Sequence, residues 1–163
     1  IELIKSYRKQ FKHRWISVMP TNLYGPGDNF DLNTSHVLPA MIRKFDDAVK
    51  AKSEVTLWGS GSPKREFLHT DDLAQAIILL MEKYDEDQHI NVGSNEELTI
   101  KELAQLIAGL AGYAGEIKWD RTKPDGTPRK IMDSTRINAL GWRPKISLKD
   151  GISSTLNWYR ENR

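Results

Sequence analysis

The sequence contains no cysteine among its 163 residues. The absence of cysteine excludes disulfides and thiolate-bound metals within these residues. It also means that cysteine usage cannot indicate whether the protein works in an oxidising or a reducing compartment. No apolar run is long enough to span a bilayer, so we expect no membrane partner. The opening residues, IELIKSYRKQFKHR, alternate apolar and cationic side chains where a signal peptide would have an apolar core, and we expect a cytoplasmic protein.

The sequence also has little net charge. The formal value is +2, whereas nucleic-acid binders usually show a strong basic cluster, so we expect no nucleic-acid partner. Hydrophobic residues make up 39% of the chain and charged residues 28%. That balance is typical of a folded globular chain and not of a disordered one.

The beginning of the sequence predicts a helix and a buried strand. Within residues 1–12, four apolar residues fall at helical spacing, namely Leu3, Ile4, Tyr7 and Phe11. A short apolar run at 15–19 follows and suits a buried strand. Because the first residue is Ile1 and the chain opens inside this helix, we expect it to be part of a longer chain.

Strands and helices alternate along the rest of the sequence. Further strands are predicted at VTLW, REFLH, HINVG and EIKW, which are residues 55–58, 65–69, 89–93 and 116–119. Helices are predicted from about 36 to 50, over 72–84, from 99 to about 112, over 134–142 and over 147–162. This alternation favours an α/β class with parallel strand pairing.

Three of the predicted helices begin at capping residues. Thr99 opens a capping box, and Ser35 could cap the helix that starts at 36. Thr70 and Asp71 make a good N-cap for the helix that follows them. Capping also explains the adjacent carboxylates of Asp71 and Asp72 better than acid–base catalysis does.

The loop PTNLYGPGDNF, residues 20–30, is the first candidate binding segment. It follows a predicted strand, and open α/β sheets bind ligands beyond the carboxyl ends of their strands. Asn22, Tyr24 and Asn29 can exchange hydrogen bonds there, while proline and glycine fix the backbone. A rigid turn without a ligand explains the same composition equally well.

His36 follows this loop at a predicted helix start. Histidine can act as a general acid near neutral pH. A lone histidine in such a place is more often a surface or capping residue, and that interpretation stays open. None of the four histidines is spaced as a metal-binding pair, so we expect no metal site.

Cations and one aromatic residue gather around two later loops. Arg43, Lys44, Lys64 and Arg65 could bind a diphosphate, which the arginine fork suits well. Trp58 could stack on a base or a sugar. Taken singly, each residue is more typical of a solvated or core position, so the binding interpretation depends on their clustering.

Asp125 lies in KPDGTPRK, where Pro124 and Gly126 are ordinary turn formers. Its carboxylate could bind ligand hydroxyls or could simply belong to the turn. A Gly-rich dinucleotide loop is absent, because the nearest match, GSGSPK, precedes an extended segment and not a helix. Walker and G-x-S-x-G motifs are absent as well.

Taken in order, five segments resemble the C-terminal half of the extended short-chain dehydrogenase/reductase family. They are PTNLYGPGDNF, SHVLPAMIRKF, LWGSGSPKREFLHTDDLAQAI, NVGSNEELTIKELAQLI and KPDGTPRKIMDSTRINALGWRPKISLKDGI. YGPGD and the pairing of REF with DDLA are shared by many nucleotide-sugar epimerases and dehydratases. SHVLPA, WGSGSPKREF and DGTPRK favour the branch that forms GDP-L-fucose, and the resemblance covers essentially the whole chain.

The resemblance implies a role for each candidate position. The nicotinamide side of an NADP site would be lined by Pro20, Thr21, Asn22 and Leu23. His36 would border the cofactor and act as the catalytic acid of epimerisation. The GDP-sugar would be bound by Lys44, Trp58, Arg65 and Asp125. Some relatives have arginine where this chain has Lys44, so a fork is replaced there by a point charge.

The resemblance also implies how the chain is divided. Residues 1–24 would be the tail of a Rossmann-type domain, and residues 25–163 the substrate-binding region, with excursions back to the Rossmann sheet. The Gly-rich loop, catalytic serine, Tyr-x-x-x-Lys pair and catalytic cysteine of the family would all precede Ile1. The N-terminal cofactor fold would therefore be largely absent. The opening helix would continue the one that forms the homodimer interface in the family.

The complete enzyme implied is an NADP-dependent homodimer that converts GDP-4-keto-6-deoxy-D-mannose to GDP-L-fucose, and this chain alone would be inactive. Two alternatives stay open. One is another NAD(P)-dependent nucleotide-sugar epimerase or dehydratase. The other is a non-catalytic module for GDP-sugar binding or oligomerisation.

Overall fold

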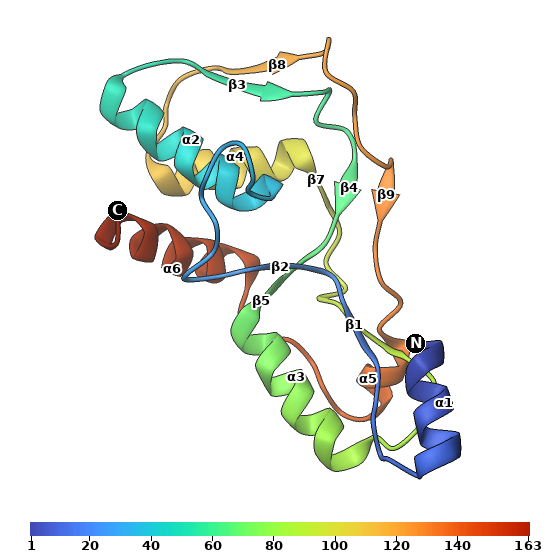
Figure 1. The fold of residues 1–163 in the computed structure, drawn as a ribbon. Coiled ribbons are helices and arrows are strands. Elements are labelled where there is room, and N and C mark those ends of the chain that lie inside the picture. Colours follow the sequence, from blue (N-terminus) through green and yellow to red (C-terminus); the bar gives the residue numbers. More distant parts are fainter.

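The computed structural model describes residues 1–163 as six helices and nine short strands (Figure 1). The helices are α1 Glu2–Phe11, α2 Val37–Ala51, α3 Thr70–Lys83, α4 Ile100–Ala111, α5 Thr135–Ala139 and α6 Leu148–Glu161. The strands are β1 Val18–Pro20, β2 Asn22–Tyr24, β3 Val55–Trp58, β4 Lys64–Arg65, β5 Phe67–His69, β6 Ile90–Val92, β7 Leu98–Thr99, β8 Ile117–Asp120 and β9 Arg129–Lys130.

The strands form four small sheets. Three are parallel pairs, which join β1 with β6, β2 with β5, and β3 with β8. The fourth has the order β7-β4-β9, with β4 antiparallel to β7 and parallel to β9. The predicted α/β class with mainly parallel pairing is therefore confirmed.

Two hydrophobic cores hold these elements together. The larger, of 17 buried residues, lies among α2, α4, α6 and β3 in the upper part of Figure 1. On α2 the buried residues Leu38, Met41, Ile42 and Phe45 follow the helical repeat. The smaller core, of eight buried residues, lies among α3, α5 and β6. The β2–β5 pair lies between the two parts (Figure 1).

The local signals at several helix ends are confirmed. The Thr99 side chain accepts a hydrogen bond from the Glu102 N–H and the Glu102 carboxylate accepts one from the Thr99 N–H, so the capping box is complete. Gly112 ends α4 in the left-handed region, with φ of 82°. Ser147 caps α6 by accepting the Asp150 N–H. Local chemistry fixes these ends.

The predicted cap of α3 is wrong. His69 is the N-cap, and its Nδ1 accepts the backbone N–H of Asp71 at 3.2 Å. Asp72 does not act as a capping residue either. The residue is 3% exposed, and its carboxylate accepts the backbone N–H groups of Lys145 and Ile146, both at 3.0 Å. The partner segment is 73 residues away in sequence, so local patterns could not reveal this role.

The start of α2 also differs from the prediction. His36 occupies the N-cap and makes no side-chain capping bond, and the hydroxyl of Ser35 is buried without a partner. The run at 15–19 is not one strand. The strand instead begins at Val18, and the loop at 20–30 contains β2. Since β1 pairs with β6 and β2 with β5, the extended chain is divided between two sheets.

The predicted strand at 65–69 is likewise split. Arg65 ends β4 and Phe67 begins β5, with Glu66 between them at 0% exposure.

No helix is long and apolar enough to cross a membrane. No group of three or more His, Asp or Glu side chains lies together as a metal site requires.

Candidate functional site

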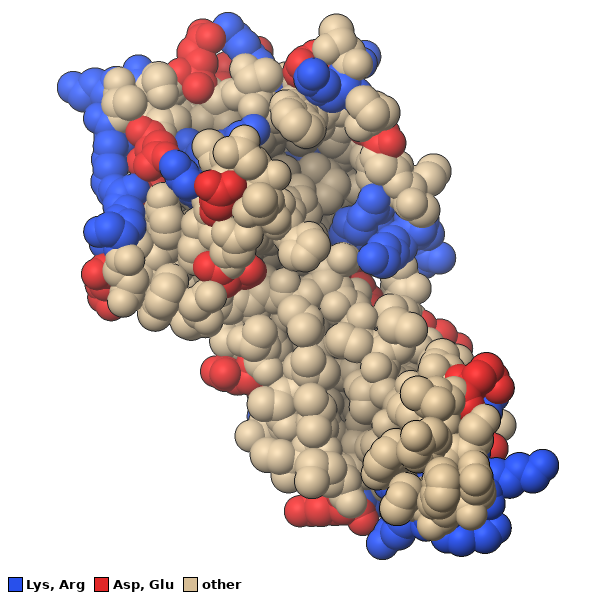
Figure 2. Space-filling view, viewed as in Figure 1, with Lys and Arg blue, Asp and Glu red and all other residues tan.

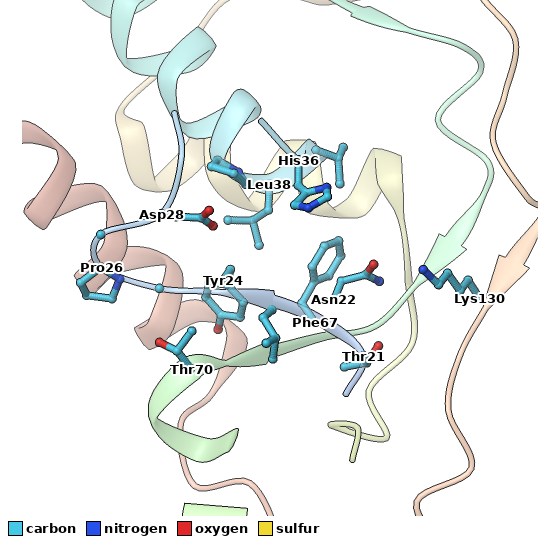
Figure 3. A pocket seen from close by; sticks show the side chains of 15 residues that line it. Thr21, Asn22, Tyr24, Pro26, Asp28, His36, Leu38, Phe67, Thr70 and Lys130 are labelled. Carbon is cyan, nitrogen blue, oxygen red and sulfur yellow. The ribbon is translucent and has the colours of Figure 1, made fainter. Parts of the chain in front are cut away.

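A pocket with a volume of about 640 Å³ lies beside the β2–β5 pair (Figure 3). Its floor is formed by Thr21, Asn22, Leu23 and Tyr24, and by Phe67 from the paired strand. Its other walls are the turn at 25–28 and the start of α2 at 36–39, with Thr70 and Lys130 completing the lining. The predicted residues Thr21, Asn22, Leu23 and His36 therefore lie together, whereas Pro20 precedes the pocket.

The floor of this pocket is fixed by hydrogen bonds and close packing. The Asn22 amide donates to the backbone oxygen of Glu66 at 2.9 Å, and the Thr21 N–H donates to Val92 at 3.0 Å. A side chain at Gly25 would collide with the hydroxyl of Thr70, so only glycine lets this turn pass so close to α3. The polar groups of the floor are thus held in place before any ligand arrives.

His36 is exposed and its imidazole lies above Asn22 and Phe67 (Figure 3). The residue caps α2 only through its extended backbone, with φ of −73° and ψ of 169°. Its side chain makes no capping hydrogen bond. The alternative of a capping imidazole is therefore not what the structure shows, and both ring nitrogens are free to meet a ligand.

Lys130 reaches from β9 towards Asn22 with its ammonium end nearest the pocket (Figure 3). Lys130 is not among the site residues predicted from the sequence. Its partner in the β4–β9 ladder is Arg65 itself, since Lys64 pairs with Arg129 and Arg65 with Lys130. The ladder therefore connects the pocket to the predicted diphosphate-binding side chain. A cation so close after Asp125 in DGTPRK was the available sequence signal.

Arg65 is a cation without an anionic partner. Its guanidinium donates to the backbone oxygens of Lys64 at 2.7 Å and Thr127 at 2.6 Å, and to no carboxylate. By contrast, Lys64 pairs with Glu97 at 2.7 Å and Arg43 with Asp47 at 3.5 Å. The predicted cluster of four cations is thus reduced to Lys44 and Arg65. Figure 2 shows Lys and Arg side chains grouped where β4 and β9 lie.

Trp58 is 68% exposed and has ammonium groups on its ring. The Nζ of Lys44 lies 5.9 Å from the ring centroid and the Nζ of Lys123 lies 5.5 Å from it. Lys44 also donates to the backbone oxygen of Thr56 at 3.3 Å, and burial lowers the pKa of its ammonium. A large exposed aromatic face flanked by cations suits an anionic ligand with a flat ring.

Asp125 is bound to the turn that follows Trp58. Its Oδ1 accepts the N–H of Ser60 at 2.8 Å and its Oδ2 accepts the hydroxyl at 2.6 Å. The Ser60 side chain and then its N–H are the main causes that lower the pKa of this carboxyl. A carboxylate offers about four acceptor positions. The two that remain can receive ligand hydroxyls.

The comparisons with known proteins agree with this geometry. The family model described as NAD dependent epimerase/dehydratase family matches residues 1–93. The chain belongs to this family. A putative GDP-L-fucose synthase 2 from Arabidopsis thaliana is 58% identical over 166 residues, which is 99% of this chain and 50% of the relative.

Two further relatives give the same picture. The GDP-L-fucose synthase of Escherichia coli K12 is 49% identical over 172 residues, 99% of this chain and 54% of that protein. A GDP-L-fucose synthetase from Naegleria fowleri, solved bound to NADP, has a TM-score of 0.91 at 28% identity over 99% of this chain and 53% of its own. The resemblance seen in the five segments is confirmed. The chain spans about half the length of the curated relatives it matches.

Proposed function

We propose that residues 1–163 form the substrate-binding half of an NADP-dependent epimerase-reductase that converts GDP-4-keto-6-deoxy-D-mannose to GDP-L-fucose. The observation that supports this most is that the free imidazole of His36 and the side chain of Lys130 line one pocket, and that Lys130 pairs in the β4–β9 ladder with Arg65, whose guanidinium has no anionic partner. Trp58 ends β3, and Asp125 is bound to Ser60 in the turn that follows it.

The GDP part of the substrate would lie along these later loops. The Arg65 fork would bind the diphosphate, since its two existing hydrogen bonds leave other N–H donors free. Trp58 would stack on the base or a sugar ring, with Lys44 beside it. Asp125 would accept hydroxyl groups. Each contact uses a side-chain group that the fold holds in place and that still has a free face, donor or acceptor for a ligand.

The residues of the pocket fit the nicotinamide end of NADP, and only that end. Pro20 ends β1, and Thr21, Asn22 and Leu23 line the pocket directly after it, whereas no Gly-rich loop for a pyrophosphate occurs in these residues. NADPH supplies the hydride that reduces the C4 ketone when it is bound. The remaining part of its site would come from the half of the relatives that this chain does not span.

His36 would return the proton during epimerisation. The 4-keto group makes the protons on C3 and C5 acidic, so a base can remove each proton to leave an enolate. Inversion then requires an acid on the opposite face. His36, exposed in the pocket and free of a capping bond, can donate that proton. The base would lie outside these residues, which contain no cysteine.

The arrangement of the complete protein follows as part of the proposal. Residues 1–24 would end the Rossmann-type domain and residues 25–163 would form the substrate-binding region. In α1 no residue is buried, and Leu3 and Phe11 are 68% and 50% exposed, which supports a homodimer interface on this helix. We place the enzyme in the cytoplasm. The isolated chain would bind GDP but would not catalyse the conversion of the GDP-sugar.

Calorimetric titration of the 163-residue chain with GDP, and with ADP for comparison, tests the binding part of this proposal. We expect GDP to bind and Arg65→Ala to weaken it about 10- to 100-fold, because a charged hydrogen bond contributes about 1.5–3 kcal/mol. Arg65→Lys should restore only part, because the fork is lost. Lys64→Ala is the matched control, since Glu97 already neutralises that cation. A chain that does not bind GDP would contradict the proposal.

A further inference from the structure

Glu66 lies between the two ligand-facing sides of the site, and nothing in the proposed chemistry uses it. It separates β4 from β5 and follows Arg65 directly. Its side chain is 0% exposed. A carboxyl is among the groups that proteins bury least readily without a specific partner. Its contacts therefore indicate what it does.

The backbone of Glu66 faces the nicotinamide side. Its carbonyl oxygen accepts the side-chain amide of Asn22 at 2.9 Å and the hydroxyl of Thr21 at 3.4 Å. Both residues lie on the floor of the large pocket. The position of residue 66 thus sets the orientation of the two polar side chains there.

The carboxyl of Glu66 contacts the chain that follows residues 121–130. Its Oε1 accepts the backbone N–H of Met132 at 3.2 Å. Met132 follows the segment 121–130, in which every residue is exposed and which includes Lys123, Asp125 and Lys130. Met132 is half-buried, so this hydrogen bond lies where the exposed segment returns to the interior. The segment is also held by the β4–β9 ladder, by the Ser60 hydrogen bonds to Asp125 and by the Arg129–Glu97 ion pair, but the Met132 hydrogen bond is its contact with the Glu66 carboxyl.

Gly93 shows how closely this carboxyl is enclosed. A Cβ added to Gly93 would collide with Oε1 of Glu66. The other oxygen, Oε2, is buried and has no hydrogen-bond partner. A carboxyl in such surroundings favours its neutral form, and burial raises the pKa of Glu66, opposed by donors on Thr21, Met132 and Asn95. Glutamine is the closest neutral replacement in shape.

We propose that Glu66 is a positioning residue that anchors the segment 121–130 through Met132, and that it thereby sets Asp125 and Lys130 for the GDP-sugar while its carbonyl orients Asn22. This inference rests on the proposed function. Glu66 is buried and contacts no ligand itself. Its proposed role is to couple the cofactor side of the site to the GDP side.

Three variants separate positioning from general stability. Glu66→Gln keeps an oxygen that can accept the Met132 N–H, so GDP affinity should stay within about threefold of the parent chain. Glu66→Leu removes the acceptor, so affinity should fall about tenfold or more. Ser134→Ala is the matched control. Its hydroxyl is also buried without a partner and also lies close to Gly93, yet it anchors nothing, and affinity should be unchanged.

GDP titration and amide hydrogen exchange of residues 121–134 are measured on the same samples, with affinity referred to the folded fraction. Among Glu66→Gln, Glu66→Leu and Ser134→Ala, we expect faster exchange in this segment for Glu66→Leu only. If Glu66→Leu does not fold, Gly93→Ala displaces the same carboxyl without removing it and should reproduce both effects. Unchanged affinity and exchange in the folded variant, or an equal loss in Glu66→Gln, would overturn the inference. Failure of the parent chain to bind GDP would instead contradict the proposed function.

Discussion

The guanidinium of Arg65 lies against Gly126, at 3.0 Å from the point that a Cβ on that glycine would occupy. The same guanidinium donates to the backbone oxygen of Thr127 at 2.6 Å. The turn after Asp125 therefore leaves room for the arginine because residue 126 has no side chain. Two segments about sixty residues apart in sequence meet at this contact.

This contact gives the first prediction, which concerns Gly126→Ala. The backbone at 126 lies outside the left-handed region, so the free energy of unfolding should change little. The added methyl must displace the guanidinium of Arg65 by a few tenths of an ångström, and GDP affinity should fall about three- to tenfold. Titration and urea unfolding of the same variant check the two parts. Tighter or unchanged GDP binding would show that Arg65 does not contact the ligand.

Asp72 gives the second prediction. Its buried carboxylate accepts the N–H groups of Lys145 and Ile146, which precede α6. Asp72→Ala leaves two donors without a partner, so the free energy of unfolding should fall by about 2–5 kcal/mol. Urea unfolding measures this, with Asp71→Ala as the exposed control. A loss no larger than that of the control would indicate that water replaces the carboxylate.

The third prediction is a pH dependence from Glu66. Burial raises the pKa of its carboxyl above the ordinary 4.5, so the folded chain binds more protons than the unfolded chain between the two values. The free energy of unfolding therefore falls as pH rises through this window. Glu66→Gln should remove that fall. The free energy of unfolding of the variant should therefore exceed that of the parent chain by a growing amount as the pH rises above 4.5. A difference independent of pH would contradict the raised pKa.

Much of the fold could be predicted from the sequence because its signals are local. The capping box at Thr99 and the glycine end of α4 each involve residues within a few positions of one another. The division of residues 65–69 into β4 and β5 could not be predicted from the sequence, because it depends on distant partners. β4 pairs with β7 and β9, while β5 pairs with β2. Which partner each residue takes is decided by the tertiary arrangement.

In the candidate site, too, side-chain chemistry could be predicted from the sequence, whereas tertiary contacts could not. Each of Lys44, Trp58, Arg65 and Asp125 could be selected by side-chain chemistry and by the family resemblance. Lys64 was equally suitable on chemistry alone, and only its ion pair with Glu97 removes it. Glu66 could not be found because nothing in REF distinguishes a buried carboxyl from an exposed one. Burial and its contact with Met132, 66 residues away, reveal its role.

The proposed role of His36 is the central claim, and it needs a complete enzyme. A chimera that joins the N-terminal half of the Escherichia coli GDP-L-fucose synthase to residues 1–163 supplies one, since this chain aligns with 54% of that relative. If His36 were only an exposed surface residue, its replacement would leave the rate per folded molecule unchanged. A general acid typically contributes about 10²–10⁴-fold to the rate, so His36→Asn should slow product formation by that order.

The decisive measurement is the formation of GDP-L-fucose from GDP-4-keto-6-deoxy-D-mannose and NADPH by this chimera in deuterated water, with label followed at C3 and C5. We predict that the parent chimera forms labelled GDP-L-fucose. The His36→Asn chimera should still lose the protons at these carbons but should return them poorly on the inverted face, and should reduce some un-epimerised sugar. Formation of GDP-L-fucose by the His36→Asn chimera at the parent rate per folded molecule would contradict the account.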